Sequence, residues 1–302
     1  MKASLFTLGA FVSTGLAAEL ALPQGWFTFQ PTEKIKHTQF KGKPRYLSWM
    51  ADSQIQHGVE PTLAYTVSAF YSGILLAYER TRDRKYFDYV KRGADILLYP
   101  EHDGTVLMYN NSNSIDDIRI GHTFLDIYNV TGEEIYKKAA TSMRKQIDRT
   151  GRTPNGGFYH RFPAYIDQMW LDGFYMLDDK TTKGWWLVMD PGLEGKSGNY
   201  IESSGTAMFV NGLFKAMRKG YIHGDKYLQS ALTGYKLMTS KFAQPHPHDG
   251  ALAWEWTVQT GSLSSNGTFE YYASMPLFEN DLKGVAPFLF SSYEYELYQE
   301  RA

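Results

Sequence analysis

Cysteine is absent from this 302-residue sequence. Its absence excludes a disulfide scaffold, a thiolate zinc site, an iron–sulfur cluster and a cysteine nucleophile. An excess of one charge is also absent, because 31 Lys and Arg residues balance 32 Asp and Glu residues and leave a formal net charge of −1. Proteins that bind nucleic acid usually carry a basic excess on one face, so we expect no nucleic-acid partner.

Several catalytic motifs are missing as well. The sequence has no His-Glu-x-x-His pair and no Gly-x-Ser-x-Gly elbow, and Gly156-Gly157 lacks the Lys-Ser/Thr that completes a phosphate loop. His246 and His248 flank Pro247 on a loop, without the third and fourth ligands that a metal site needs. We therefore expect no metal ion.

Long hydrophobic runs are missing too, and no stretch approaches about 18 uninterrupted apolar residues, so we expect no contact with a membrane. The N-terminus instead resembles a secretory signal peptide. Lys2 supplies the charge, residues 5–16 contain a short apolar run, and Gly15-Leu16-Ala17-Ala18 offers a cleavage site. We expect residues 1–18 to be this signal and the protein to be secreted and extracellular; the alternative is an N-terminal core helix. Three Asn-x-Ser/Thr sequons fit a glycoprotein, namely Asn110, Asn129 and Asn266.

Aromatic residues are abundant, since 7 Trp, 22 Tyr and 18 Phe make up 16% of the chain. Flat amphipathic rings suit a surface that binds hydroxylated ring-shaped ligands such as sugars. Large helical enzymes also use such rings as packing, so composition alone leaves both interpretations open.

A helical unit recurs along the chain. Polar turns at 81–86, 131–136 and 222–227 precede periodic helical runs at 87–98, 137–147 and 228–238. A more apolar helix precedes each turn, at 63–78, 118–128 and 204–219. Tyr86 and Tyr136 are 50 residues apart, and a period of this length indicates stacked supersecondary units. The pattern predicts a mainly α protein, either a closed ring of helix pairs with a cleft at one end or an open solenoid.

The repeat is interrupted after its second unit. Tyr136 and Tyr227 are 91 residues apart, which is nearly two periods. Between them we find only a short helix at 168–177 and a turn-like stretch at 178–199. Helices are therefore missing there relative to a regular ring.

Two segments carry residues suited to catalysis. Asp116 and Asp117 lie directly before an apolar helix, where a loop at the mouth of a ring would form a cleft. The alternative is helix capping, although one carboxylate suffices for a cap. His160, Trp170 and Asp172 offer an imidazole, an aromatic platform and a carboxylate within thirteen residues, which suits binding a sugar and moving a proton.

The surroundings of Asp172 matter for that chemistry. Its neighbours on both sides are apolar, and burial would raise its pKa so that it can act as acid and as base. The alternative is a capping role before Gly173. A third segment, 198–207, reads as a helix start capped by Ser203 or Ser204.

These motifs together resemble glycoside hydrolase family 105, the unsaturated rhamnogalacturonyl hydrolases. The similarity runs from about residue 45 to the C-terminus and rests on Gly157-Phe158-Tyr159-His160, Gln168-Met169-Trp170-Leu171-Asp172-Gly173, Glu202-Ser203-Ser204-Gly205-Thr206-Ala207-Met208-Phe209 and Glu279-Asn280-Asp281-Leu282-Lys283-Gly284-Val285. The resemblance implies an all-α (α/α)6 barrel, a six-hairpin toroid, as one catalytic domain over residues 19–302.

The resemblance also implies a reaction. The substrate is an oligosaccharide from rhamnogalacturonan or pectin whose terminal uronic acid carries a C4=C5 double bond left by a lyase, and the enzyme hydrates that bond. Asp172 matches the acid/base position and Asp116 the second essential carboxylate. His160 and Trp170 match substrate-binding positions. No organic cofactor is implied.

One departure from the family is evident. A Trp-Gly-Arg-x-x-Gly-Trp motif that supplies substrate contacts is absent. The barrel is therefore predicted to be incomplete by about one to two hairpins between residues 178 and 198. We expect Trp185 and Trp186 to plug the opening. The alternative function is that of a non-catalytic or degenerate homologue, a sugar-binding remnant with impaired uronate binding. The oligomeric state is not predicted.

Overall fold

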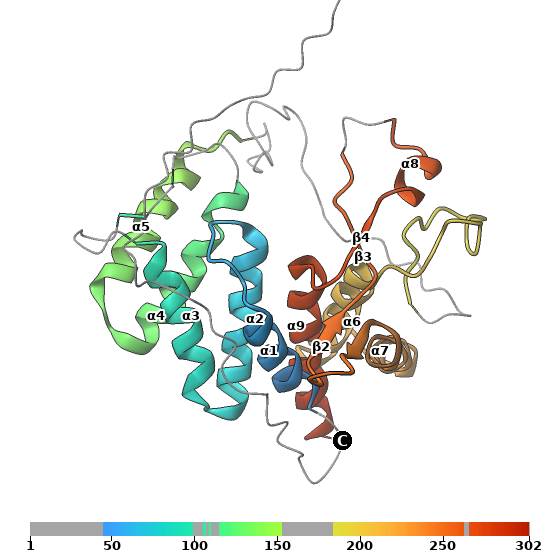
Figure 1. Ribbon diagram of the computed structural model, residues 1–302, viewed down its shortest axis with the longest axis horizontal. Helices are drawn as coiled ribbons and strands as arrows, with labels where there is room; N and C mark the ends of the chain where they lie inside the picture. The colour runs from blue at the N-terminus through green and yellow to red at the C-terminus, as the bar shows by residue number, and fades with distance from the viewer. Residues whose placement is uncertain are drawn as a thin grey trace, which may run out of the picture. The chain divides into compact units, whose positions relative to one another are not determined.

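The computed structural model describes residues 45–98, 105–106, 109, 115–152, 184–262 and 266–301. All of them belong to one compact unit, Glu33–Ala302, and most are helical (Figure 1). The helices are α1 (Tyr46–His57), α2 (Tyr65–Thr81), α3 (Arg84–Ile96), η1 (Ile115–Ile118), α4 (Ile120–Thr131), α5 (Glu134–Arg149), α6 (Ser203–Arg218), α7 (Asp225–Leu237), η2 (Met238–Phe242), α8 (Phe269–Ala273) and α9 (Leu282–Gln299). Within these residues, no helix is both long enough and apolar enough to cross a bilayer.

The helices pack in pairs. Contacts join α2 to α3, α4 to α5, and α6 to α7, which are the three pairs that the repeat predicts. A fourth pair, which the repeat does not reveal, is made by α9 and α1. One helix of each pair also packs against its counterparts, in the order α4, α2, α9, α6, so these four form an inner layer (Figure 1). The predicted short helix at 168–177 lies outside the described residues.

Two of the hairpin turns share one hydrogen-bond pattern. Thr81 and Thr131 end their inner helices, and each hydroxyl donates to the carbonyl four residues earlier, at 2.7 and 3.0 Å. Each hydroxyl also accepts the N–H two residues later, at 3.1 and 3.2 Å. The next residue is left-handed in both turns, with φ 60° at Arg82 and 73° at Gly132. The 50-residue repeat is therefore confirmed at atomic detail for these two units.

The inner layer is tightly packed. Gly73 on α2 faces Leu289 on α9, where an added Cβ would lie 2.7 Å from Leu289 Cδ1. A side chain at this position would push the two helices apart. Between α6 and α9, the Arg218 guanidinium donates two hydrogen bonds to the Glu294 carboxylate, at 2.5 and 2.6 Å. The inner helices are thus held by close packing and by a bidentate ion pair.

Short strands, which the helical pattern did not predict, lie beside the inner layer. β1 (Ala243–Pro245) pairs antiparallel with β2 (Leu252–Trp254), and β3 (Thr257–Val258) pairs antiparallel with β4 (Leu277–Phe278). Trp254 on β2 is fully buried and its Nε1 donates to the Thr257 hydroxyl at 3.0 Å. These two-stranded ribbons fix the chain that leads into α9.

The start of α6 differs from the prediction. The cap is Glu202, whose carboxylate accepts the N–H of Gly205 at 2.6 Å, so the expectation of Ser203 or Ser204 is wrong. Ser203 already belongs to the helix, and its hydroxyl is hydrogen-bonded to that of Thr257 at 2.9 Å. The Ser203 hydroxyl is therefore engaged by a strand residue 54 positions away and does not cap the helix.

The described part of the predicted turn-like stretch, residues 184–199, contains no helix. Trp185 is buried against the inner helix α6, with its ring 4.9 Å from that of Phe209. Trp186 is half-buried and forms a bridge with Ile201. The expectation that this segment covers an inner helix is confirmed for Trp185 and holds in part for Trp186. Residues 178–183 lie outside the described residues.

Candidate active site

Asp116 lies at the end of the inner layer where the helices begin. It belongs to the 3-10 helix η1, directly before α4. The Ser68 hydroxyl near the start of α2 donates to the Arg119 carbonyl at 3.0 Å, so α2 and α4 begin at the same end. The sequence therefore correctly predicts that Asp116 lies just before the start of an inner helix.

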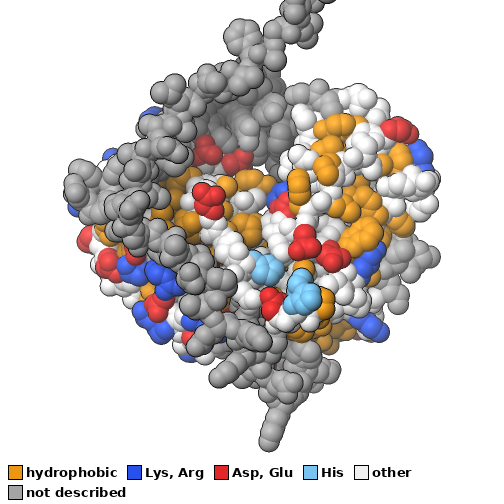
Figure 2. Space-filling view, in the orientation of Figure 1, with side chains coloured by type: hydrophobic (Ala, Val, Ile, Leu, Met, Phe, Trp, Pro, Cys, Tyr) orange, Lys and Arg blue, Asp and Glu red, His pale blue; other side chains and the backbone are white. Residues whose placement is uncertain are grey.

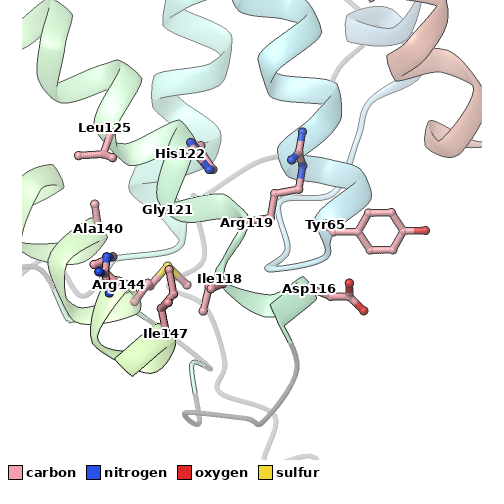
Figure 3. A pocket seen from close by; sticks show the side chains of 11 residues that line it. Tyr65, Asp116, Ile118, Arg119, Gly121, His122, Leu125, Ala140, Arg144 and Ile147 are labelled. Carbon is pink, nitrogen blue, oxygen red and sulfur yellow. The ribbon is translucent and has the colours of Figure 1, made fainter. Parts of the chain in front are cut away.

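A cavity of about 440 Å3 opens beside Asp116. Side chains of α2, η1, α4 and α5 line it: Tyr65, Asp116, Ile118, Arg119, Gly121, His122, Leu125, Ala140, Met143, Arg144 and Ile147. Figure 3 shows that Tyr65 and Asp116 point in the same direction, away from the side where Leu125 and Ala140 lie. Tyr65 and Asp116 therefore form one end of the cavity, and His122 and Arg144 lie beside the apolar side chains at the other end.

The end of the cavity that carries Tyr65 and Asp116 has side chains that can recognise an acidic sugar. The Asp116 carboxylate can accept hydrogen bonds from sugar hydroxyls, and the Arg119 guanidinium can bind a carboxylate. The Tyr65 ring is 40% exposed, which leaves a face on which a sugar ring can stack. Sequence analysis missed Tyr65 and Arg119, although both lie at the starts of predicted inner helices, which is the signal that could have found them.

Capping does not explain Asp116. The N-cap residue of α4 is Arg119, whose side chain makes no capping hydrogen bond. The backbone carbonyl of Asp116 accepts the Arg119 N–H at 3.2 Å. Asp116 therefore does not occupy the N-cap position of α4.

The other predicted site residues, His160, Trp170 and Asp172, lie outside the described residues. Their positions relative to Asp116 stay predictions. Asp117, the neighbour of Asp116, is on η1 as well but does not line the cavity.

A second carboxylate, Glu202, lies at the start of an inner helix but has a structural role. It is 6% exposed, and burial raises its pKa while backbone N–H groups oppose that shift. Its oxygens accept the Gly205 N–H at 2.6 Å and the Val258 N–H at 3.2 Å. Burial and the charge of Glu202 raise the pKa of Tyr200 to about 12. Because Glu202 is occupied by these donors, we interpret it as the residue that holds α6 to β3.

The histidine pair at 246 and 248 forms part of a surface group. Histidine side chains lie beside acidic ones on the face shown in Figure 2. His246 and His248 have ring centroids 5.3 Å apart, and His246 Nδ1 lies 3.6 Å from the Asp249 carboxylate. Asp249 also accepts a hydrogen bond from Gln56 at 2.8 Å, and its pKa is lowered mainly by the Ala251 N–H. Among the described residues, no group of three or more His, Asp or Glu side chains is arranged to hold a metal ion.

Paired helices around an inner layer, with a carboxylate at the end where the inner helices begin, define an α/α-barrel protein. The profile of Glycosyl Hydrolase Family 88 matches residues 44–180 and 177–299. The chain therefore belongs to Glycosyl Hydrolase Family 88.

Two curated relatives match part of the chain. Protein Atu3128 of Agrobacterium fabrum is 28% identical over 124 residues, which are 38% of this chain and 52% of that protein. The unsaturated rhamnogalacturonyl hydrolase YesR of Bacillus subtilis is 31% identical over 119 residues, 36% of this chain and 32% of YesR. The matched part thus spans about half of the first relative and a third of the second.

A solved structure shows the same fold over most of the chain. It is a glycoside hydrolase from family 105 of C. acetobutylicum, with a TM-score of 0.76 and 23% identity. The match covers 84% of this chain and all of that one. This likeness confirms the predicted all-α, six-hairpin fold class, whereas the number of absent hairpins stays a prediction.

Proposed function

We propose that the protein is a hydrolase that removes a C4=C5-unsaturated uronic acid from lyase-generated rhamnogalacturonan or pectin oligosaccharides. The observation that carries this proposal is the cavity at the start of the inner helices. There, Asp116, Arg119 and Tyr65 line one cavity, which offers a carboxylate, a guanidinium and an aromatic ring to a ligand. Membership of Glycosyl Hydrolase Family 88 and the similarity to YesR support the same reaction.

Asp172 is the proposed acid and base. Its carboxylic acid donates a proton to C4 of the unsaturated ring, which leaves positive charge at C5 and the ring oxygen. A water molecule then adds its oxygen to C5 and gives its proton to the Asp172 carboxylate, which restores the acid. The resulting hemiketal opens, and the bond to the remaining sugar breaks. One group can perform both steps if its pKa lies near the working pH, which the apolar neighbours of Asp172 favour.

The other proposed residues bind and orient the sugar. Asp116 accepts the ring hydroxyls of the uronate, and Arg119 binds its carboxylate. His160 and Trp170 complete the contacts, with Trp170 as a stacking surface. In this proposal residues 19–302 form a single catalytic domain.

The test follows the ultraviolet absorbance of the conjugated uronate in lyase-generated rhamnogalacturonan fragments. Wild-type protein should consume the chromophore, and Asp172→Asn should not, because the amide keeps the shape but cannot donate or return the proton. Asp88→Asn, a half-exposed carboxylate on α3 that pairs with Arg84 and lines neither cavity, is the matched control and should keep full activity. Near-wild-type turnover by Asp172→Asn would disprove the role of Asp172. If the wild-type protein binds the fragments without consuming them, the sugar-binding homologue becomes the function.

Secretion is part of the proposal and has its own support. Lys2 and the apolar run at 5–16 fit a signal peptide, and two sequons, at Asn129 and Asn266, have exposed asparagines. The sequon at Asn110, like residues 1–18, lies outside the described residues. N-terminal sequencing of protein from the culture medium should give a chain that starts near Glu19. Retention inside the cells with Met1 intact would disprove secretion.

A further inference from the structure

We propose that the inner helices carry a second binding site, for an acidic saccharide, beside the first cavity, with which it shares Arg119. A cavity of about 670 Å3 is lined by α2, α4, α6 and α9. Its volume falls within the range of about 300–1,000 Å3 that is typical of small-molecule sites. The site does not depend on the proposed reaction.

Two hydrogen-bonded side-chain pairs join the helices that line this cavity. Arg218 on α6 donates to both oxygens of Glu294 on α9, and Glu294 is 5% exposed. The Tyr293 hydroxyl donates to the Glu79 carboxylate of α2 at 2.8 Å. Two of the three carboxylates that line the cavity are thus already engaged by neighbouring donors, so they repel an incoming anion less than isolated carboxylates would.

Three other cations line the cavity without such partners. Arg82, Arg119 and Lys215 form no ion pair with any residue that the structure describes. They come from the end of α2, the start of α4 and the last turns of α6, so they surround the cavity from three helices. Cations on several sides of one cavity favour a ligand with a carboxylate or another acidic group.

Hydroxyl-binding groups stand beside these cations. The Asn211 side chain offers an amide donor and acceptor, and the Tyr78 ring offers an aromatic face. The third carboxylate, Asp126, can accept hydrogen bonds, and burial raises its pKa. Inorganic phosphate would use the cations alone, whereas a uronate sugar would use the cations, the amide and the ring.

The test is calorimetric titration of the full chain with saturated digalacturonate, which has no C4=C5 bond and is therefore not hydrated. The protein is produced in bacteria, so that Asn129 at the cavity carries no glycan. All titrations use the Asp116→Asn background, which weakens binding at the first cavity. Arg119 lines both cavities and is left unchanged.

In that background we expect saturable binding of digalacturonate. Lys215→Glu and Arg82→Glu should each weaken it at least about tenfold, because each replaces an attracting charge by a repelling one. Lys236→Glu, an exposed lysine on α7 outside the cavity, is the matched control and should bind as before. All three positions are exposed, so melting temperatures should agree and exclude misfolding.

Three outcomes would overturn the proposal. One is the absence of digalacturonate binding, and another is equal binding by Lys215→Glu and Lys236→Glu. The third is that inorganic phosphate or neutral digalactose binds as tightly as digalacturonate, because the site would then recognise only charge or only hydroxyls. None of these outcomes bears on the hydration reaction, which is measured separately by the loss of ultraviolet absorbance.

Discussion

Trp185 stacks on Phe209 of the inner helix α6, with ring centroids 4.9 Å apart and an interplanar angle of 28°. Only 2% of the Trp185 side chain is exposed. In a complete ring, a neighbouring hairpin would cover each inner helix. Here a residue of the segment before α6 covers part of this inner helix.

We predict that Trp185→Ala lowers the free energy of unfolding by about 3 kcal/mol or more and promotes aggregation, because a large buried ring is removed and apolar surface is exposed. Trp185→Phe should be milder, since the Trp185 Nε1 is buried without a hydrogen-bond partner among the described residues. Urea unfolding and light scattering measure both effects. Tyr221→Ala is the control, because Tyr221 is 80% exposed and its loss should change stability by less than about 0.5 kcal/mol. Equal stability of Trp185→Ala and Tyr221→Ala would contradict this role.

The two equivalent hairpin turns allow a reciprocal test. Gly132 and Arg82 both follow an inner helix with positive φ, a conformation that costs a residue with a side chain roughly 1–2 kcal/mol. Gly132→Ala should therefore destabilise the protein by about 1 kcal/mol, and Arg82→Gly should be neutral or stabilising. The melting temperatures of both variants, measured by thermal unfolding, test these two expectations. A stabilising Gly132→Ala would show that the turn relaxes out of the left-handed region.

The sequence predicts the helix pairs well because their signals are local. Period-3.6 apolar runs and the threonine turns at 81 and 131 act within a few residues, and the structure repeats them 50 residues apart. The strands β1 to β4 escape prediction because two or three residues show no periodicity. The cap of α6 escapes it because Glu202 is held partly by Val258, 56 residues away.

The candidate site also contains residues that the sequence predicts and residues that only the structure reveals. Asp116 is found from its place before an apolar helix. Tyr65 is not found, because its nearness to Asp116 depends on how one hairpin packs on the next, whereas Arg119 lies only three residues after Asp116 and could have been found from the sequence. The second cavity is missed for the same reason, since its cations come from three helices that only the fold brings together.

Glu202 yields a prediction about pH. Because burial raises its pKa above the ordinary value of 4.5, the folded protein binds this proton more tightly than the unfolded chain does. The stability it contributes is present below pH 4.5 and is lost as the pH rises through the folded pKa. In Glu202→Gln, the amide cannot accept hydrogen bonds from both Gly205 and Val258, so we expect a loss of about 1 kcal/mol or more at pH 4. The wild-type advantage should shrink between pH 4 and pH 7 in urea unfolding; an advantage that grows with pH would show that the N–H donors hold Glu202 ionised.

The two adjacent aspartates of η1 allow the proposed role of Asp116 to be tested against a neighbouring carboxylate. Asp116 lines the cavity and Asp117 does not, although both lie on the same short helix. We predict that Asp116→Asn reduces turnover of the unsaturated uronate at least about a hundredfold, because a hydrogen-bonding charge at the substrate is lost, whereas Asp117→Asn keeps turnover within about threefold. The melting temperatures of both variants should stay close to that of the wild type, because the N-cap residue of α4 is Arg119 and not an aspartate. A cap would give the reverse result for Asp116→Asn, namely about 1 kcal/mol less stability with activity unchanged. Measuring melting temperature and turnover on the same preparations therefore decides between the two roles, and an unstable but fully active Asp116→Asn would assign this aspartate to the fold alone.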